Sequence, residues 1–446
     1  MIQVKRWITI TLCTAATCVG NNLSAQERPA VWDLESCINY AMEQNITIRQ
    51  NKIAAESAYV DVKTSQAALF PNLSFSTSHN FANRPWPQGN NNSKKNTYNG
   101  NYGLNASWTV YNGGKNTKTI EQQKLNNRVS ELNVEQSEDD IEISITQLYV
   151  QILYADESVK INQNTLEVSE AQVNRAKELL KAGYIAQSDY AQLEAQYSND
   201  KYSLVNSQAA LQNYKLQLKQ LLELDGEEEM NLLLAEISNE SVVTILPGKS
   251  DVYRTALSIR PEIEASKLNI EASDLGISIA KAGYMPSLSL TAGIGTGHSN
   301  NSGKDFTFNE QIKDSWSNSV GVTLSVPIFN NRQTKSTVQK ARLQYESSKL
   351  NMMNEEKALY STIESIWLDA NTAQQKYVAA SEKLRSSQTS YELVSEQFNV
   401  GMKNTVELLT EKNNLLSAQQ EVIQAKYMAV LNIQLLRFYQ GENITL

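Results

Sequence analysis

Two segments far apart in the chain share one alternation of large and small side chains. AALFPNLSFSTS begins at residue 67 and AGYMPSLSLTAG at residue 282, so that Pro71 and Pro286 lie 215 positions apart (286 − 71 = 215). After each proline, apolar side chains alternate with Ser, Asn, Thr or Gly. A period of two is typical of a β-strand whose two faces meet different surroundings.

The alternation predicts four strands with the same two faces. One face is large and partly aromatic, and the other is small and uncharged, whereas a soluble sheet usually exposes Lys and Glu. This pattern is typical of transmembrane β-barrel strands. Two amphipathic hairpins on a soluble core are the alternative. The strands are expected at 72–81, 98–111, 287–296 and 316–326, with Tyr98, Trp108 and Trp316 near strand ends as a membrane aromatic girdle. The polar segment 297–315 is expected to be an outer loop.

Apolar positions in the rest of the chain step by three and four residues, which is typical of α-helices. The longest stretches contain no proline, and a helix of about 68 residues would be on the order of 100 Å long. Gly183 and Gly401 follow the long stretches and are expected to end them. The helices are expected at about 33–69, 115–182 and 187–223, and again at about 250–284, 331–399 and 404–440.

The two halves therefore read as a tandem duplication, and a long internal repeat constrains the fold more than any single motif. We predict a first repeat at 26–225 with a β-hairpin at 71–111. An irregular linker at 226–249 would join it to a second repeat at 250–446 with a β-hairpin at 286–328. Such long amphipathic helices need neighbours along their whole length, from the other repeat and from other copies of the chain.

The first 25 residues have the features of a secretory signal peptide. Lys5 and Arg6 precede an apolar run too short to span a bilayer, and LSA precedes Gln26. Neither Cys13 nor Cys18 has a good lipidation sequence before it. Cleavage leaves Cys37 as the one cysteine and a net charge of −10 (−8 − 2), which argues against a nucleic-acid partner.

Four strands cannot close a barrel, because the smallest barrels have about eight, and an open sheet edge is not tolerated in lipid. The membrane interpretation therefore requires two or more copies of the chain. The fold class expected from the sequence is a mixed α+β membrane protein in which strands continue into very long helices.

The chain resembles the TolC-like outer-membrane efflux proteins over nearly its whole mature length. The resemblance lies in WDLESCINYAMEQN (32–45), FPNLS, MPSLS, VYNGGK, PIFNN and VGMKNTVELL (400–409). It implies a homotrimer with a 12-stranded barrel in outer-membrane lipid, four strands from each chain, continued by a periplasmic α-helical barrel. It also implies an exit duct for tripartite pumps, with a periplasmic adaptor and an inner-membrane transporter of the RND, ABC or MFS type as partners.

The resemblance further implies a constriction at the periplasmic tip, where the family has the pattern Gly-x-Arg-Thr-x-x-Asp-x-x-Asp in the second repeat. Glu407 stands at the first acidic position, whereas Thr410 replaces the second and Lys403 replaces the arginine. Phe398 replaces a tyrosine of the closed-state latch, and the first-repeat acid, Asp189, is present. The turns at Gly183 and Gly401 would contact the adaptor. A solvated helical pair is the alternative role for Lys403 and Glu407.

Nothing in the sequence points to an enzyme, a cofactor or a metal site. His79 and His298 have no partner cluster, and GIGTGHS (293–299) lacks the ending of a phosphate-binding loop. We expect an outer-membrane exit duct. A secreted trimeric stalk or adhesin without a channel, and a type I protein-secretion duct, are the alternatives.

Overall fold

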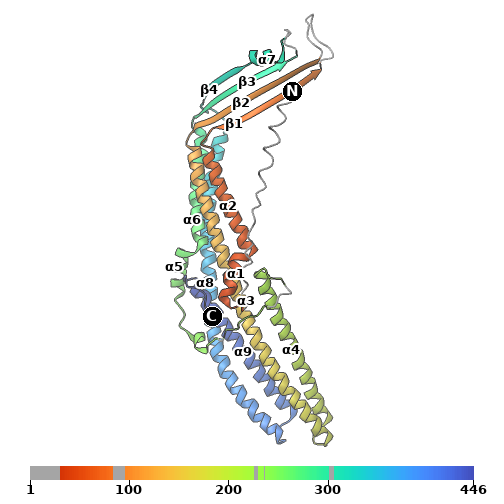
Figure 1. Ribbon diagram of the computed structural model, residues 1–446. Helices are drawn as coiled ribbons and strands as arrows, with labels where there is room; N and C mark the ends of the chain where they lie inside the picture. Colours follow the sequence, from red (N-terminus) through yellow and green to blue (C-terminus); the bar gives the residue numbers. More distant parts are fainter. Residues whose placement is uncertain (1–30, 84–95, 226–229, 236, 301–305) are drawn as a thin grey trace.

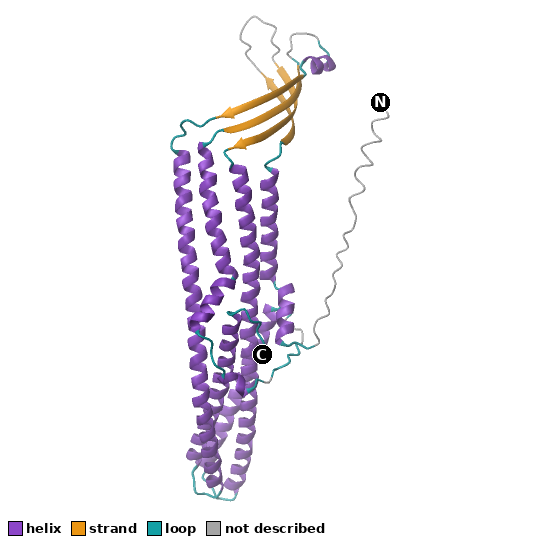
Figure 2. Ribbon diagram, turned by 90° about the vertical axis from the view of Figure 1, so that its left-hand side faces the viewer, coloured by secondary structure: helices purple, strands orange, loops and turns teal. Residues whose placement is uncertain are grey.

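The computed structural model describes residues 31–83, 96–225, 230–235, 237–300 and 306–446. A four-stranded sheet lies at one end of a long bundle of helices, and the described strands and helices follow the predicted order in both halves (Figures 1 and 2). The predicted signal peptide lies outside the described residues.

The four strands form one continuous antiparallel sheet. They are β1 (Asn72–Asn83), β2 (Asn96–Asn112), β3 (Ser287–Ser299) and β4 (Ser317–Ser325), in the order β1-β2-β3-β4. Each repeat supplies one antiparallel pair, and β2 and β3 join the two repeats. The outer strands β1 and β4 each leave one edge unpaired within the described chain.

The pairing register places all the large side chains on one face, as the alternation predicts. Phe75 lies opposite Leu104, and Leu104 lies opposite Ile294. The register shifts between Thr109 and Tyr111, and this shift places Tyr111 opposite Leu288. A β-bulge of this kind adds one residue to a strand and interrupts its alternation.

Each strand continues into a helix, so the helices lie in the order of the strands. These helices are α2 (Ile46–Ala67), α3 (Lys115–Lys181), α6 (Pro261–Lys281) and α8 (Gln333–Asn399). α2 packs on α3, α3 on α6 and α6 on α8. The backbone has positive φ at Gly113 and Gly114 before α3, and at Asn331 and Arg332 before α8. Only the first repeat places glycines, which tolerate this conformation, at the turn.

The first helix of each repeat is interrupted, although the sequence predicts one helix. In the first repeat, α1 (Leu34–Gln44) and α2 meet at Asn45, whose side chain accepts hydrogen bonds from the backbone of Thr47 and Ile48. In the second, α5 (Lys249–Ile259) and α6 meet at Arg260, directly before Pro261. A proline disfavours helical geometry in the residue before it, and an asparagine cap starts a new helix.

The lower part of the molecule consists of two helical hairpins. α3 packs along α4 (Gln187–Leu221), and α8 packs along α9 (Thr405–Phe438). Above them, at the level of α1 and α5, an apolar core joins the repeats through side chains such as Tyr149, Leu218 and Tyr427. The short helix η1 (Asn239–Val243) packs on α8 and α9 beside this core.

The segment 297–315, expected to be a polar loop, contains a helix in its described part. α7 (Phe308–Asp314) begins with a capping box between Thr307 and Glu310. It packs on β3, where Thr296 donates a hydrogen bond to the carbonyl of Ile312 over 2.6 Å. The short helix η2 (Ala282–Tyr284) lies between α6 and β3.

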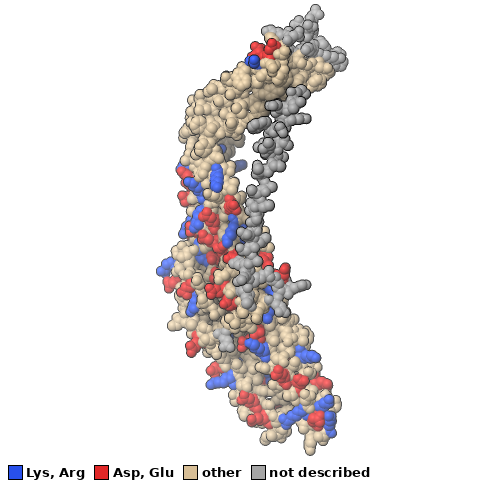
Figure 3. All heavy atoms as spheres, in the orientation of Figure 1, with Lys and Arg blue, Asp and Glu red and all other residues tan. Residues whose placement is uncertain are grey.

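Charge is distributed unevenly over the surface. Lys, Arg, Asp and Glu side chains cover the helices, while the sheet surface seen in Figure 3 carries almost none outside α7. Among the described residues, no helix combines the length and the apolar character needed to span a membrane.

Candidate functional site

Much of the apolar face of the sheet is exposed. Phe75 is 67% exposed, and Val320 on β4 is 86% exposed. α7 contacts the outer end of the face, where the ring centroids of Phe308 and His298 lie 4.9 Å apart. Burying such a face would release a large hydrophobic free energy, at about 25 cal/mol per Å². The opposite face carries small uncharged residues. Some of them lie directly opposite one another on neighbouring strands, as do Ser74, Asn105, Gly293 and Ser319.

Aromatic residues mark both ends of this apolar face. Tyr98 and Trp316 lie at the end near α7, and Trp108 lies toward the helices, where its indole N–H donates to the carbonyl of Leu69 over 2.7 Å. Their place agrees with the girdle expected from the sequence, whose contact with lipid stays a prediction.

The two histidines, one from each repeat, come together, which the sequence did not indicate. His79 and His298 lie 6.3 Å apart between ring centroids, and Tyr98 and Tyr102 contact both rings. Gly100 lies between the two histidines in the pairing register, and a Cβ there would meet the ring of His298 at 2.2 Å. The cluster fills the outer end of the apolar face with rings.

At the opposite end of the molecule, both hairpins turn through a glycine. Gly183 and Gly401 have φ of 80° and 77°, which confirms that they end the long helices. At these turns, the amides of Tyr184 and Met402 bond back to the carbonyls of Leu179 and Gln397. The turns are exposed, as a contact surface for a partner would be.

Glu407 lies in the first turn of α9, where it is part of a capping box. Its backbone N–H donates to Asn404 Oδ1 over 2.9 Å, and its carboxylate accepts the N–H of Asn404 over 3.1 Å. Lys403 Nζ pairs with the same carboxylate, and this hydrogen bond holds the pKa of Glu407 below its usual range. Glu407 is therefore ionised and oriented at the tip.

The remaining tip residues lie around this turn. Phe398 is half-buried at the end of α8, and Thr410 is exposed and bonds to the carbonyl of Val406 in its own helix. Asp189 occupies in α4 the third helical position that Glu407 occupies in α9. In the described chain, Lys403 pairs with Glu407 and not with Asp189.

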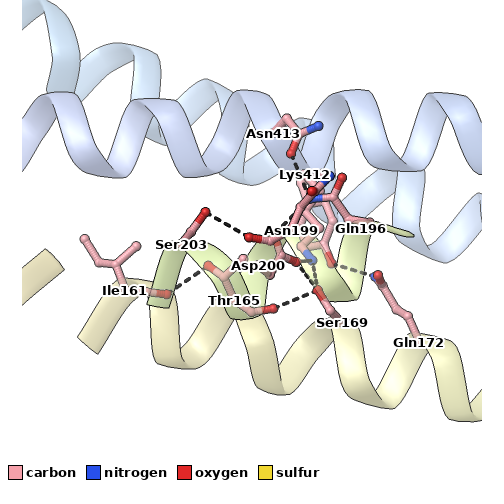
Figure 4. Close-up of polar contacts among 11 residues, drawn as sticks. Ile161, Thr165, Ser169, Gln172, Gln196, Asn199, Asp200, Ser203, Lys412 and Asn413 are labelled. Atoms are coloured by element: carbon pink, nitrogen blue, oxygen red, sulfur yellow. Dashed lines mark hydrogen bonds and ion pairs between the residues drawn. The ribbon is translucent and has the colours of Figure 1, made fainter. Parts of the chain in front are cut away.

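A buried charged group between the hairpins was missed by the sequence reading. We call Lys412, Asp200 and Ser169 the Lys412 cluster (Figure 4). Lys412 Nζ lies 2.6 Å from Asp200 Oδ2, and the two side chains are 5% and 4% exposed. Ser169 bonds to both, and the amide of Gln196 donates to Asp200 Oδ1 over 2.8 Å. The cluster joins α3 and α4 of the first repeat to α9 of the second.

The Lys412 cluster occupies positions where the helices otherwise bury apolar side chains. The other buried residues of α4 are Leu193, Leu204, Leu211 and Leu218. Lys412 itself follows the buried Leu408 by four residues. A polar residue interrupting this spacing was the signal in the sequence, but its partners are 212 and 243 residues away.

Further polar contacts join the two hairpins, from Tyr427 in the apolar core down to the tip. We call this line of contacts the hairpin seam. The residues are paired as follows: Tyr427 with Glu157 at 3.1 Å, Ser158 with Gln420 at 3.1 Å, Gln196 with Asn413 at 3.4 Å, Gln172 with Tyr391 at 3.2 Å, and Arg175 with Asn399.

Comparison with known proteins gives one consistent result. The family model described as "Outer membrane efflux protein" matches residues 37–223 and 252–442. The outer membrane protein TolC of Vibrio cholerae is 20% identical over 410 residues, which cover 92% of this chain and 91% of TolC. The alkaline protease secretion protein AprF of Pseudomonas aeruginosa is 23% identical over 301 residues, which cover 66% of this chain and 61% of AprF. The solved structure of CusC has a TM-score of 0.79 at 18% identity and covers 92% of each chain.

Proposed function

The chain belongs to the outer membrane efflux protein family, and we propose that it is the exit duct of a tripartite efflux or secretion system. As a member of this family it is a channel protein of the outer membrane, and its helices lie in the periplasm. In the proposed role, it passes substrates passively from an inner-membrane transporter across the periplasm and the outer membrane.

One observation carries the proposal: the sheet exposes an apolar face, while its other face is small and uncharged. The apolar side chains include Phe75, Leu104 and Val322, all exposed. Lipid is the environment in which an uncharged, apolar outer face is stable, and a small polar inner face leaves room for water and solutes. A stalk or adhesin would not require such an inner face on every strand.

The two unpaired sheet edges support assembly from several copies. In lipid, every backbone group needs a partner, so the free edge of β1 requires the free edge of β4 from another copy. Three copies of this four-stranded sheet give 12 strands, which is the homotrimer expected from the family. The same closure brings the edge helices α2 and α8 of neighbouring copies together.

We place the closed constriction at the tip of the second-repeat hairpin, around Glu407, with Lys403, Phe398, Thr410 and Asp189 nearby. The turns at Gly183 and Gly401 are the proposed contact for a periplasmic adaptor, which links the duct to an RND, ABC or MFS transporter. Their exposure and their position farthest from the sheet support this role (Figure 1).

Protein secretion is a second candidate for the cargo. It is favoured by the similarity to AprF, named an alkaline protease secretion protein. The family description instead names efflux. Both uses require the same duct, so this choice concerns the transporter and not the architecture of the chain.

The decisive experiment joins mass and conductance on the detergent-purified protein. Chemical cross-linking should give a trimer, and the same sample should form ion channels in planar lipid bilayers. A cross-linked trimer without channels would favour the stalk, and a monomer without channels would overturn the duct altogether.

A further inference from the structure

A cleft lies at the end of the sheet that carries α7 (Figure 1). β4 begins at Ser317, opposite Gly295, whereas β3 continues to Ser299 and stays paired with β2. Beyond Gly295, α7 takes the place of a fourth strand beside β3. A helix packs farther from a strand than a paired strand does, so a cavity of about 730 Å³ remains between β2, β3 and α7.

The walls of this cleft are held in place by hydrogen bonds. Gln311 of α7 accepts the backbone N–H of Ser299 over 2.7 Å, and Ser299 Oγ donates to Asn99 Oδ1 on β2 over 2.6 Å. Together with the bond from Thr296 to the carbonyl of Ile312, these contacts fix the helix against the strands. The cleft is therefore preformed, and a ligand would not have to order its walls.

Two glycines of β3 form part of the lining. Gly297 lies opposite Asn101 in the register, and a Cβ at Gly297 would come within 2.8 Å of Asn101 Oδ1. At Gly295 a Cβ would meet Ser317 Oγ at 3.5 Å, which is an ordinary contact. A larger side chain at residue 295 would therefore fit the strand and occupy part of the cleft.

The described lining of the cleft is polar and almost uncharged. It includes amides and hydroxyls from Asn99, Asn101, Ser315 and Ser317, and the aromatic residues Tyr102 and Phe306. Asp314 is the one acidic residue among the described lining residues, which include neither Lys nor Arg. An anion would lack a counter-charge there, and an apolar ligand would leave the polar groups without partners.

Some of these polar groups are free to bind a ligand. Within the described chain, the exposed carboxylate of Asp314 has neither a hydrogen-bond nor an ion-pair partner, and the hydroxyl of Ser315 has none either. Asp314 is the last residue of α7, where a negative charge does not stabilise a helix. A carboxylate accepts up to about four hydrogen bonds. Free acceptors and donors beside aromatic residues suit a ligand that has many hydroxyl groups and apolar C–H faces, which is the chemistry of a sugar.

We propose that the cleft between β2, β3 and α7 binds an uncharged saccharide, with Asp314 accepting hydrogen bonds from its hydroxyl groups. The volume lies within the range of small-molecule sites, about 300–1,000 Å³. Binding is independent of the proposed function, and only the position of the cleft at the outer mouth of a pore rests on it. The saccharide is either a free oligosaccharide or the uncharged headgroup of a glycolipid, since both present the same hydroxyl groups.

Saturation-transfer NMR on the purified protein tests the site, in a detergent without a sugar headgroup. Maltotriose or triacetylchitotriose should bind saturably, with a Kd of about 1 mM or below. Asp314→Ala should weaken binding by about tenfold or more, because hydrogen bonds to a charged group are among the stronger ones. Lys313→Ala is the matched control. It changes the adjacent exposed residue of α7, which does not line the cleft, and should bind as the wild type does. Absence of binding of both sugars to the wild type, or equal binding in Asp314→Ala, would overturn the proposal.

Gly295→Val is a second variant that leaves the carboxylate in place. Its β-branched side chain suits a strand and should block the cleft, so binding should be lost while cross-linked assembly is unchanged. Retained binding would place the sugar outside the cleft and overturn the assignment. If Gly295→Val does not assemble, the comparison of Asp314→Ala with Lys313→Ala decides.

Dodecyl maltoside distinguishes the two sources, because it carries a similar sugar on an alkyl chain. Displacement of maltotriose by this compound would identify the headgroup of a glycolipid as an occupant, and no displacement would identify a free oligosaccharide. Both results require a bound sugar and therefore support the site. A protein that binds maltotriose but forms no channel in planar bilayers would contradict the proposed function alone, and a channel that binds no sugar would contradict the saccharide site alone.

Discussion

The sheet and the helices place their large apolar side chains in opposite ways. On the helices, large apolar residues are buried, as Tyr149 and Leu218 are at 1% and 0% exposure, and charges cover the surface. On the sheet, large residues such as Phe75 are exposed, and the four strands contain no Lys, Arg, Asp or Glu. The polarity of the surface therefore changes where strands continue into helices.

This inversion shows that one chain is adapted to two solvents. In water, an exposed apolar face of this size is an interaction site or a liability for aggregation, whereas in lipid it is the stable outer surface. The helices bury their apolar side chains and expose their charges, as soluble coiled coils do. The edge helices α2 and α8 need neighbours from other copies of the chain. The junction lies near Trp108, whose ring is on the apolar face and whose N–H bonds to Leu69 next to α2.

The largest effect is expected from a charge on the lipid-facing side of the sheet. Leu104 lies in the middle of β2, opposite Phe75 and Ile294, and Leu104→Arg should destabilise the assembled protein by about 2–4 kcal/mol. Its neighbour Asn105 points to the small polar face, so Asn105→Arg should be tolerated. Heat-resistant assembly on a denaturing gel measures both. Equal assembly of the two variants would contradict the assignment of the faces.

The second prediction concerns the break in the first helix, which belongs to the water-exposed half of the comparison. Asn45 is 3% exposed, caps α2, and donates its amide to the carbonyl of Leu221 over 2.9 Å. Asn45→Ala removes the cap and leaves that carbonyl without this partner, so it should lower stability by about 1–2 kcal/mol. Thermal unfolding of the purified protein measures it. Asn39→Ala, at an exposed position of α1, should leave stability unchanged. An equal loss of stability in both variants would show that the cap at Asn45 does not stabilise the protein.

The comparison also separates what the sequence could predict from what it could not. Strand faces were predictable, because alternation is local and every other residue of 287–296 obeys it. The ends of the long helices were also predictable, because a glycine just past a helix, here Gly183 or Gly401, is a local signal. The capping box of α7, Thr307 and Glu310, was also a local signal, but it lay within a segment read as a loop.

Features that depend on distant partners were missed. The helix break at Arg260 had a local signal in Pro261, but its distant contacts could not be predicted. These are the ion pair with Asp139, which is more than a hundred residues earlier in the chain, and the rings of Phe438 and Tyr439. The Lys412 cluster likewise takes one residue from each of three helices. An interrupted apolar spacing shows that a polar residue is buried, but it does not reveal what that residue meets. The tip residues derive from the family resemblance, and their role at a gate stays a prediction.

The third prediction uses the break in the second repeat, where a charged group replaces the neutral asparagine. Arg260 pairs with Asp139 over 3.1 Å and with Glu262 over 3.2 Å. Burial raises the pKa of Asp139 to about 6, because desolvation outweighs the attraction of Arg260. Between about pH 4 and 6 the folded state therefore holds a proton that the unfolded chain has lost, and stability falls as the pH rises through this range.

Asp139→Asn should remove this contribution, so the slope of stability against pH between pH 4 and 6 should become more positive by at most about 1.4 kcal/mol per pH unit. The contributions of Asp140 and Glu142, whose pKa burial also raises, should remain. Chemical denaturation at a series of pH values measures the slope. Asp251→Asn, an exposed residue of α5, is the control and should leave the slope unchanged. A steeper decline in Asp139→Asn would contradict the assigned direction.

The smallest effect on stability, and the most specific effect on conductance, is expected at the point farthest from the sheet. Glu407 is partly exposed and pairs with Lys403, so Glu407→Ala should change the stability of the protein little. If three copies form a ring of carboxylates in a narrow aqueous throat, that ring favours cations and binds multivalent ones.

Divalent or trivalent cations added on the periplasmic side should block the wild-type channel, and Glu407→Ala should weaken both the block and the cation preference without loss of assembly. The control is Glu178→Ala, since Glu178 also pairs with a lysine, Lys181, and lies in the last turn of α3 at the tip of the first hairpin. Unchanged block in Glu407→Ala would move the constriction away from this hairpin. Equal weakening in both variants would show that general surface charge, and not a ring at Glu407, governs the entrance.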